Sequence, residues 1–149
     1  GGTVLCPGSP QSALQFIDAR DAAALMLRAA QAARCETMNL TGPTEPLTMG
    51  AFFNASRAVL NPNATLRWID EATLLAAGIA PWTELPLWVP ADTAGLHVVN
   101  LDRARAAGLV CRPLADTLRD TAAWAATAPQ AVPPTIGLDP QRELALLAA

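Results

Sequence analysis

The fold is decided by two stretches of sequence, Phe16-Ile-Asp-Ala-Arg-Asp21 and Met38-Asn-Leu-Thr-Gly-Pro43. The apolar run Leu14–Ile17 predicts a strand, and Asp18 follows it as the N-cap of an amphipathic helix. A second strand is predicted over Thr37–Thr41, where a glycine–proline pair then ends it. Strand, helix and strand in this order make one βαβ unit, so the sequence predicts an α/β fold.

Helix and strand signals continue on both sides of this unit. Further strands are predicted over Val4–Cys6, Thr65–Ile69 and Leu96–Leu101. Helices are predicted from the N-cap Thr48 to Leu60, over Glu71–Ala77, from Asp102 to a stop at Gly108, from Pro113 to Ala126, and from Asp139 onward. A proline-rich linker is predicted over Pro129–Pro134.

Composition limits the classes of protein to which the chain can belong. It has 149 residues, of which 52% are hydrophobic and only 15% are charged, so a packed domain is predicted rather than a disordered segment. The net charge is −3 and no cluster of basic residues occurs. Binding to nucleic acid needs several basic side chains on one face, and the sequence therefore predicts no nucleic-acid partner.

Cysteine usage and hydropathy indicate the compartment. Cys6, Cys35 and Cys111 are odd in number and contain no C-x-x-C pair, so neither a disulfide framework nor a metal site is expected. No apolar run approaches the roughly 20 residues that span a bilayer, and no signal peptide is recognised. These observations predict a cytoplasmic protein without a membrane partner.

In order and spacing, the elements resemble the C-terminal half of the extended short-chain dehydrogenases/reductases, the NAD-dependent epimerase/dehydratase family. The similarity covers nearly the whole chain from Val4 onward. It rests on five pieces, namely Phe16-Ile-Asp-Ala-Arg-Asp-Ala22, Met38-Asn-Leu-Thr-Gly-Pro43, Leu47-Thr-Met-Gly50, Asn100-Leu-Asp-Arg-Ala-Arg-Ala-Ala-Gly108, and Arg112-Pro-Leu with Trp124.

This resemblance implies an architecture. It implies the last strands of a doubly wound, Rossmann-like sheet together with a small α+β substrate-binding domain. The corresponding division places the terminal strands and helix of a nucleotide-binding domain at residues 1–43 and the substrate-binding domain at 44–128. Residues 129–149 would then be a linker and a C-terminal helix.

The resemblance also implies a chemistry whose main groups this chain lacks. The family holds NAD or NADP with a glycine-rich loop and manages the hydroxyl proton with a Tyr-x-x-x-Lys pair. The 149 residues contain no tyrosine, no lysine and no such loop. We therefore expect no catalytic residue in this chain and no tight binding of the dinucleotide by it. The missing groups are expected on sequence upstream of residue 1.

The family's nucleotide-sugar members suggest what the substrate is not. Such members follow the strand that corresponds to Thr65–Ile69 with an arginine-rich segment that clamps a pyrophosphate. Here Asp70 and Glu71 stand in that place, with no arginine beside them. Two acids would repel a pyrophosphate, so a small carbonyl or hydroxyl compound is the expected substrate.

Four residues are the candidates for substrate binding. Trp82 and Trp88 lie in the tryptophan- and proline-rich loop Pro81–Pro90, where aromatic walls would suit a small ligand. Arg67 alternates with Trp68 on its strand, and Arg20 begins the first long helix. The alternative for each is structural: the tryptophans pack the loop onto the domain, and the arginines are solvated or paired within a helix.

Three interpretations of function stay open. The first is the substrate-side part of an NAD(P)-dependent reductase or epimerase. The second is a non-catalytic, stand-alone binding or interaction module derived from that fold, in which a homodimer would cover the edges of Leu14–Ile17 and Thr37–Thr41. The third is an unrelated α/β enzyme that uses the single histidine, His97, or an acid. Under the first two interpretations the isolated chain should be marginally stable, because parallel strands are normally buried on both faces.

Overall fold

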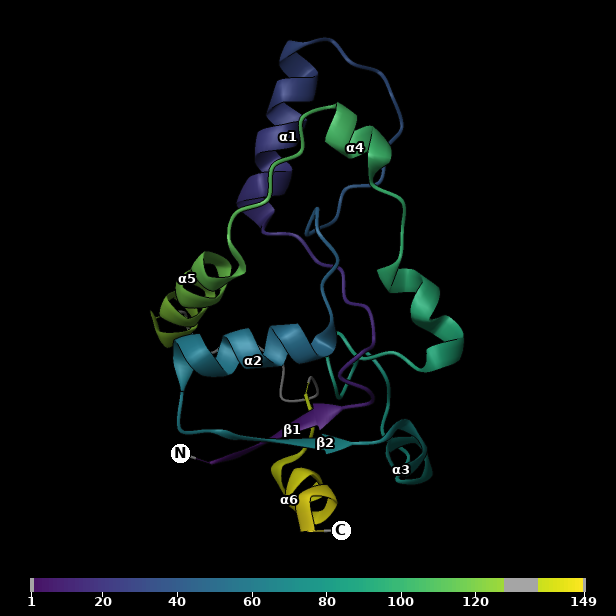
Figure 1. Cartoon of the computed structure of the whole chain (residues 1–149), viewed down its shortest axis with the longest axis vertical. Coiled ribbons are helices and arrows are strands. Elements are labelled where there is room, and N and C mark those ends of the chain that lie inside the picture. Colours follow the sequence, from purple (N-terminus) through teal and green to yellow (C-terminus); the bar gives the residue numbers. More distant parts are fainter. Residues whose placement is uncertain (1, 128–136, 149) are drawn as a thin grey trace.

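The computed structural model describes residues 2–127 and 137–148, which combine helices with a small sheet (Figure 1). The strands are β1 (Thr3–Pro7) and β2 (Thr65–Ile69). The helices are α1 (Ala19–Gln31), α2 (Met49–Leu60), α3 (Glu71–Ala76), the 3₁₀ helix η1 (Ala91–His97), α4 (Asp102–Ala106), α5 (Leu114–Thr127) and α6 (Pro140–Ala148). The α/β class is thus confirmed at the level of a mixed helix and strand fold, whereas a doubly wound sheet stays a prediction.

The sheet consists of β1 and β2, which run parallel in a register from Thr3 opposite Thr65 to Pro7 opposite Ile69. Between them the chain passes through α1 and α2, and α2 and α6 lie on opposite sides of the sheet (Figure 1). β1 belongs to the predicted unit 1–43 and β2 to the predicted unit 44–128. The sheet therefore joins residues from both sides of that expected boundary.

Helix starts and stops follow the signals in the sequence. The Asp18 side chain accepts a hydrogen bond from the Arg20 amide at the start of α1, and Thr48 accepts one from the Ala51 amide at the start of α2. Asp70 does the same for α3 through the Thr73 amide. The predicted N-caps Asp18 and Thr48 are confirmed, because a short polar side chain satisfies an amide that the helix itself leaves free. Asp70 was not among the predicted caps.

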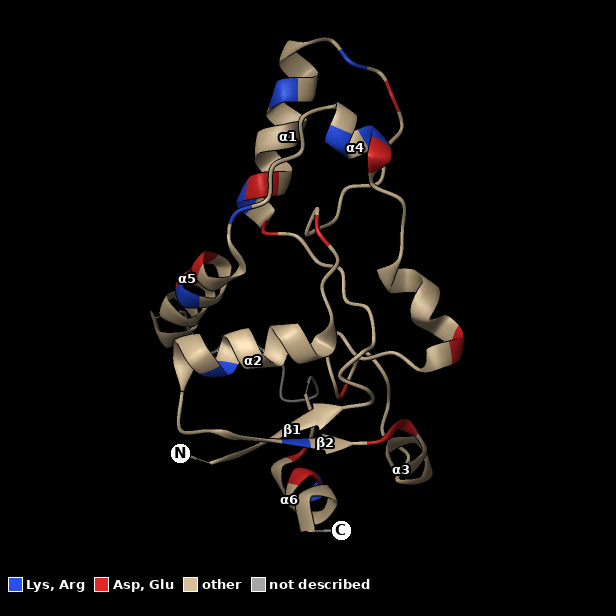
Figure 2. Ribbon diagram, viewed as in Figure 1, with Lys and Arg blue, Asp and Glu red and all other residues tan. Residues whose placement is uncertain are grey.

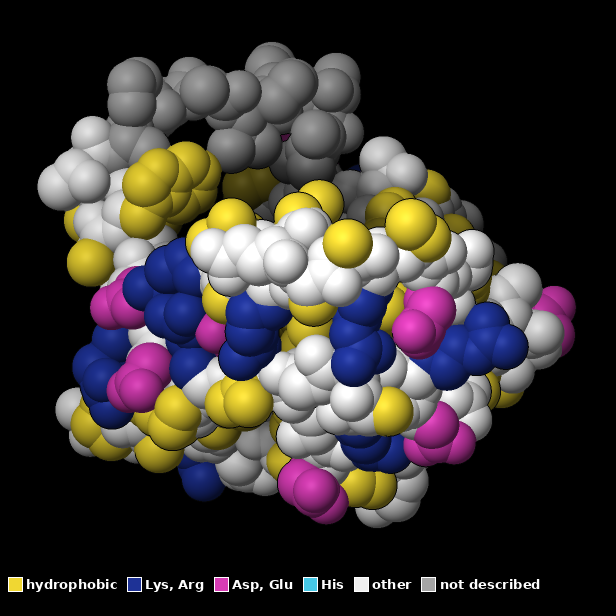
Figure 3. All heavy atoms as spheres, turned by 90° about the horizontal axis from the view of Figure 1, so that it is seen from above, with side chains coloured by type: hydrophobic (Ala, Val, Ile, Leu, Met, Phe, Trp, Pro, Cys, Tyr) yellow, Lys and Arg dark blue, Asp and Glu magenta, His cyan; other side chains and the backbone are white. Residues whose placement is uncertain are grey.

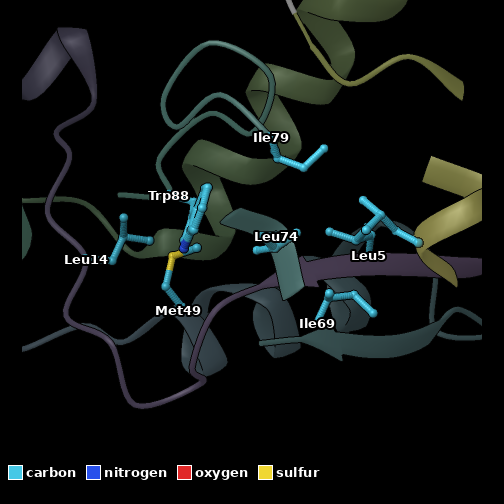
Figure 4. Close-up of a cluster of buried hydrophobic side chains, with 8 residues drawn as sticks. Leu5, Leu14, Met49, Ile69, Leu74, Ile79 and Trp88 are labelled. Atoms are coloured by element: carbon cyan, nitrogen blue, oxygen red, sulfur yellow. The ribbon is translucent and has the colours of Figure 1, made fainter. Parts of the chain in front are cut away.

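The largest hydrophobic cluster lies around the sheet, α2 and α3. Its buried members are Leu5, Leu14, Met49, Ile69, Leu74, Ile79, Trp88 and Leu146. The Trp88 ring lies over the Met49 side chain in this cluster, with Leu14 beside it (Figure 4). Three edge-to-face contacts between neighbouring rings, in the series Phe16, Phe52, Phe53 and Trp68, extend the packing along α2 to β2.

A second, smaller cluster lies at the other end of the molecule, where α1 packs beside α4 (Figure 1). Its buried members are Leu25, Ala104 and Leu109. Met26 and Leu27 of α1 are 63% and 61% exposed. Figure 3 looks down on this end and shows hydrophobic side chains at the surface among arginines and acids.

Three predicted strands are wrong for the chain as described. Leu14–Ile17 and Thr37–Thr41 are extended but belong to no sheet, and Leu96–Leu101 begins as the end of η1. Leu14 and Phe16 instead donate their amides to the carbonyls of Leu47 and Gly42, so contacts with loops replace a ladder. The physical reason is that no neighbouring strand lies within the described residues to complete one. The predicted linker Pro129–Pro134 lies outside those residues.

Candidate functional site

A cavity of about 250 Å³ opens between two extended parts of the chain. One wall is formed by residues 13–15 and 43–47, and the opposite wall by residues 97–102 with Arg105. About half of these residues are aliphatic or proline, and the polar ones include Asp102 and Arg105 of α4. A concave, largely apolar site with a few polar groups is the usual form of a small-molecule site.

Gln15 ties the two walls together. Its side-chain Nε2 donates to the Val99 carbonyl at 3.2 Å, and its Oε1 accepts from the Val99 amide at 2.9 Å. The Gln15 backbone amide donates to Nδ1 of His97 at 3.2 Å. The glutamine side chain thus bonds to both the amide and the carbonyl of Val99, as the backbone of a paired strand would. The width of the cavity depends on these bonds.

His97 is buried, with 5% of its surface exposed, and acts as the junction of three segments. Its Nδ1 accepts from Gln15, so the ring proton is on Nε2, which lies 3.0 Å from the Leu87 carbonyl. The Trp82 ring lies beside the imidazole with centroids 6.1 Å apart. Because both nitrogens are bound to the backbone, the histidine holds the wall and has no nitrogen left for a substrate or a metal.

The charged groups of the cavity are Glu45, Asp102 and Arg105. Arg105 donates through Nη2 to the Thr44 carbonyl and lies 3.4 Å from Asp102 through Nη1. The amide of Asn100 donates to the other carboxylate oxygen of Asp102 at 2.9 Å. The guanidinium therefore links α4 to the opposite wall and is balanced by Asp102.

The four residues predicted to bind substrate are not brought together. Trp88 is a core residue that is 3% exposed, while Trp82 is 56% exposed and reaches the cavity only through its contact with His97. Arg67 lies exposed on β2, beside a separate open hollow formed with α6. Arg20 lies at the start of α1, where its guanidinium binds Asp18 and Asp120. The tryptophan loop borders the cavity, but its aromatic rings do not line it.

A network of opposite charges instead joins α1 to the segment that leads into α5 (Figure 2). Arg112 donates its backbone amide, Nε and Nη2 to the Asp21 carboxylate at 2.7–2.9 Å. Hydrogen bonds from Arg20 hold the pKa of Asp18 well below its usual range, and those from Arg112 lower the pKa of Asp21. Both carboxylates are largely shielded from solvent and fully partnered, so their role is to join elements.

The thiols of Cys6 and Cys111 are poorly suited to nucleophilic chemistry. Burial raises the pKa of the Cys6 thiol to about 11, and burial also raises the pKa of Cys111. A thiol with a raised pKa is a poor nucleophile at neutral pH. No group of three or more His, Cys, Asp or Glu side chains within residues 2–127 and 137–148 is placed to hold a metal ion.

The start of α1 is a poor place for the phosphates of a dinucleotide. A phosphate is usually held by free amides at a helix N-terminus that follows a glycine-rich loop. At the start of α1 that place is taken by Asp18 and Asp21, whose carboxylates would repel a phosphate. The cavity of about 250 Å³ is smaller than the range usual for drug-sized ligands.

The chain was compared with protein-family models, curated proteins and solved structures. None of them matches it. The resemblance to the extended short-chain dehydrogenases therefore rests on the five pieces of sequence and stays a prediction. No helix in the described parts of the chain is both long and apolar enough to cross a membrane.

Sequence reasoning missed the residues that form the cavity. Gln15 and Glu45 carry no motif, and the sequence predicts residues 97–101 as part of a strand. One signal was present: Asn100 precedes Asp102 in the helix-start pattern that ends at Gly108, and both polar side chains lie at the charged end of the cavity. The contact between Gln15 and Val99 spans 84 positions and has no local signature.

Proposed function

We propose that the chain is the substrate-side part of an NAD(P)-dependent oxidoreductase or epimerase of the extended short-chain dehydrogenase type. In this proposal the cavity beside Gln15 receives a small carbonyl or hydroxyl compound. The dinucleotide and the groups that transfer the proton are supplied by residues outside these 149. The sequence resemblance is one support. The stronger support is a structural observation: at the α1–α4 end, the backbone of residues 38–41 is unpaired among the described residues and the apolar face of α1 is exposed.

The backbone of residues 38–41 is that observation. Among the described residues, no backbone hydrogen bond joins this extended segment to another part of the chain. Met38 and Leu40 pack inward on the cluster of α1 and α4, whereas Asn39 points outward, which is the alternation of a strand. An extended segment with unpaired amides and carbonyls is the edge to which a further strand adds.

The surface of α1 supports the same proposal. Met26 and Leu27 are more than half exposed, and alanines at 23, 24 and 30 are exposed on the same helix. In a βαβ unit the crossover helix buries its apolar side against a sheet. The described residues supply α1 with one small cluster and no sheet beside it. A larger parallel sheet would cover both the helix and the edge of residues 38–41.

The chemistry assigned to this chain is limited to binding. Its cavity can orient a small compound between two walls that Gln15 and His97 hold in place. It offers no tyrosine, lysine or thiolate to move a proton, so proton transfer belongs to residues outside the chain.

The test is dinucleotide binding by the native gene product that contains these residues, compared with the isolated chain. NADH and NADPH are titrated while tryptophan emission and the energy transfer to the bound nicotinamide are followed. We expect saturable binding by the native product and none by the isolated chain. A native product that binds neither dinucleotide would contradict the proposal. If that product also forms a dimer that protects residues 38–41 from hydrogen exchange, the stand-alone interaction module is favoured.

A further inference from the structure

We infer that the cavity between residues 43–47 and 97–102 selects against anions and takes neutral or cationic compounds with an apolar body. The inference rests on the proposed function in one respect, which is that the cavity receives a substrate. Three features of the cavity carry it: the walls, the charged end, and the one acid at that end for which the structure shows no partner among the described residues.

The aliphatic walls determine which kind of ligand body the cavity accepts. Leu14, Pro43, Pro46, Val98 and Val99 contribute aliphatic surface to the cavity. Burial of apolar surface is favourable and has no directional requirement, so such walls accept a compact ring or branched chain. The bonds of Gln15 to Val99 fix the distance between the walls, and that distance limits the thickness of the ligand.

The arginine of the cavity is already engaged by protein groups. Arg105 already donates to the Thr44 carbonyl and faces the carboxylate of Asp102 at 3.4 Å. A carboxylate ligand that bound the remaining N–H groups of the guanidinium would still lie close to the carboxylate of Asp102. Arg103, the next basic residue, turns away: it donates to the Thr37 carbonyl at 3.0 Å and lines a separate hollow with residues 37–39 and Asn100.

Glu45 makes the net charge at the α4 end of the cavity negative. Its carboxylate makes no hydrogen bond or ion pair with any described residue, and it lies in the wall that faces Asp102 and Arg105. One arginine against two acids leaves a net negative charge at this end of the cavity. A ligand ammonium group would be attracted there and a ligand carboxylate repelled, with an effect that salt weakens because Glu45 is exposed.

The experiment uses three probes on one ring: 4-methylcyclohexanone, 4-aminocyclohexanone and 4-oxocyclohexanecarboxylate. Binding to the native gene product is followed at low ionic strength by saturation-transfer NMR and by tryptophan emission, since Trp82 contacts His97 in the cavity wall. We expect the amine and the neutral ketone to bind, and the amine to bind about tenfold more tightly than the carboxylate.

Two variants assign the effect to a residue. Glu45→Gln should reduce the preference for the amine over the carboxylate to about threefold, while binding of the neutral ketone is unchanged. Glu143→Gln is the matched control, because it removes the same charge from α6, away from the cavity, and should leave the preference intact. Both positions lie at the surface or half-buried, so neither change should unfold the chain.

The outcomes separate this inference from the proposed function. Tighter binding of the carboxylate, binding of no probe, or an equal effect of both variants would overturn the inference even in a protein that binds NADPH. The expected order of probes in a protein that binds neither dinucleotide would support the inference and remove the oxidoreductase proposal.

Discussion

The two ends of the molecule differ in how completely their elements are packed. Around β1 and β2, eight buried side chains form one cluster, and helices lie on both sides of the sheet. Around α1 and α4, the corresponding cluster has three buried side chains, and α1 exposes Met26 and Leu27. The sheet end therefore has the larger buried core, whereas the α1–α4 end leaves more apolar surface exposed.

The C-terminal helix strengthens the sheet end further. Arg142 of α6 binds the Glu84 carboxylate and donates to the carbonyls of Ala77 and Gly78 at 3.1 and 3.2 Å. Those two carbonyls follow the end of α3, where a helix leaves acceptors free. One arginine therefore fastens α6, α3 and the tryptophan loop to one another. At the other end, Arg20 and Arg112 join α1 to α5 and to the segment before it, but these bonds lie at the base of α1 and leave its exposed apolar face uncovered.

The largest expected effect compares one leucine from each end. Leu74→Ala removes a side chain with 0% exposure from the larger cluster and should lower the free energy of unfolding by about 3 kcal/mol. Leu25→Ala, at 2% exposure in the smaller cluster, should cost about 2 kcal/mol because its surroundings can collapse more easily. Urea denaturation measures both. A larger loss for Leu25→Ala would show that the α1–α4 end is the better packed.

The charge network at the base of α1 predicts a dependence on pH. The pKa values of Asp18 and Asp21 are lowered in the folded chain, so the stability they provide is present above the unfolded value of about 4 and is lost as the pH falls through the folded values. Asp21→Asn should cost about 2 kcal/mol at pH 7 and flatten the loss of stability below about pH 4. Unfolding is followed by circular dichroism in urea from neutral to acid pH. Asp92→Asn, an exposed acid in η1, is the control and should keep the slope.

The junction between the ends depends on Gln15. Gln15→Ala removes both bonds to Val99 and leaves a half-buried backbone unsatisfied, which should lower the free energy of unfolding by about 1.5 kcal/mol. Trp82 emission should shift as well, because the segment that carries His97 loosens. Gln11→Ala is the matched control, since Gln11 bonds only to Ser9 and is exposed. Equal effects of the two changes would refute the role given to Gln15.

The smallest effect on stability is expected at the exposed side of α1. The double change Met26→Gln and Leu27→Gln should alter the free energy of unfolding by less than about 0.5 kcal/mol. It should nevertheless reduce self-association of the isolated chain, because exposed apolar groups favour aggregation. Sedimentation velocity at rising concentration measures this. Unchanged self-association would mean that the exposed face of α1 does not mediate contacts between copies of the chain.

The sequence predicted the elements that carry their own local signals. Asp18 and Thr48 mark helix starts, and Thr65–Ile69 alternates as a strand, and all three were confirmed. The strand predicted over Thr37–Thr41 was wrong, although its side chains alternate as in a strand, because a strand also requires a neighbour for its backbone. The pattern of apolar residues indicates which side chains turn inward. It does not indicate which segment supplies the strand that pairs with their backbone.

The candidate site was less predictable than the fold. The sequence predicts the tryptophans of loop 81–88 as substrate-binding residues. In the structure, Trp88 is buried in the core, and the exposed Trp82 lies beside the His97 ring. The cavity depends on contacts between residues 13–15, 43–47 and 97–102, which are far apart in sequence. Such long-range pairings follow from packing as a whole, so a single sequence without local motifs cannot reveal them.

Hydrogen exchange of the backbone amides tests the central claim most directly. In the isolated chain, we expect slow exchange in β1, β2 and α2 and fast exchange in α1 and residues 38–41, because only the former belong to a closed core. In the native gene product, α1 and residues 38–41 should become as protected as β2. Equal protection of both ends in the isolated chain would contradict the account, because the α1–α4 end would then need no partner.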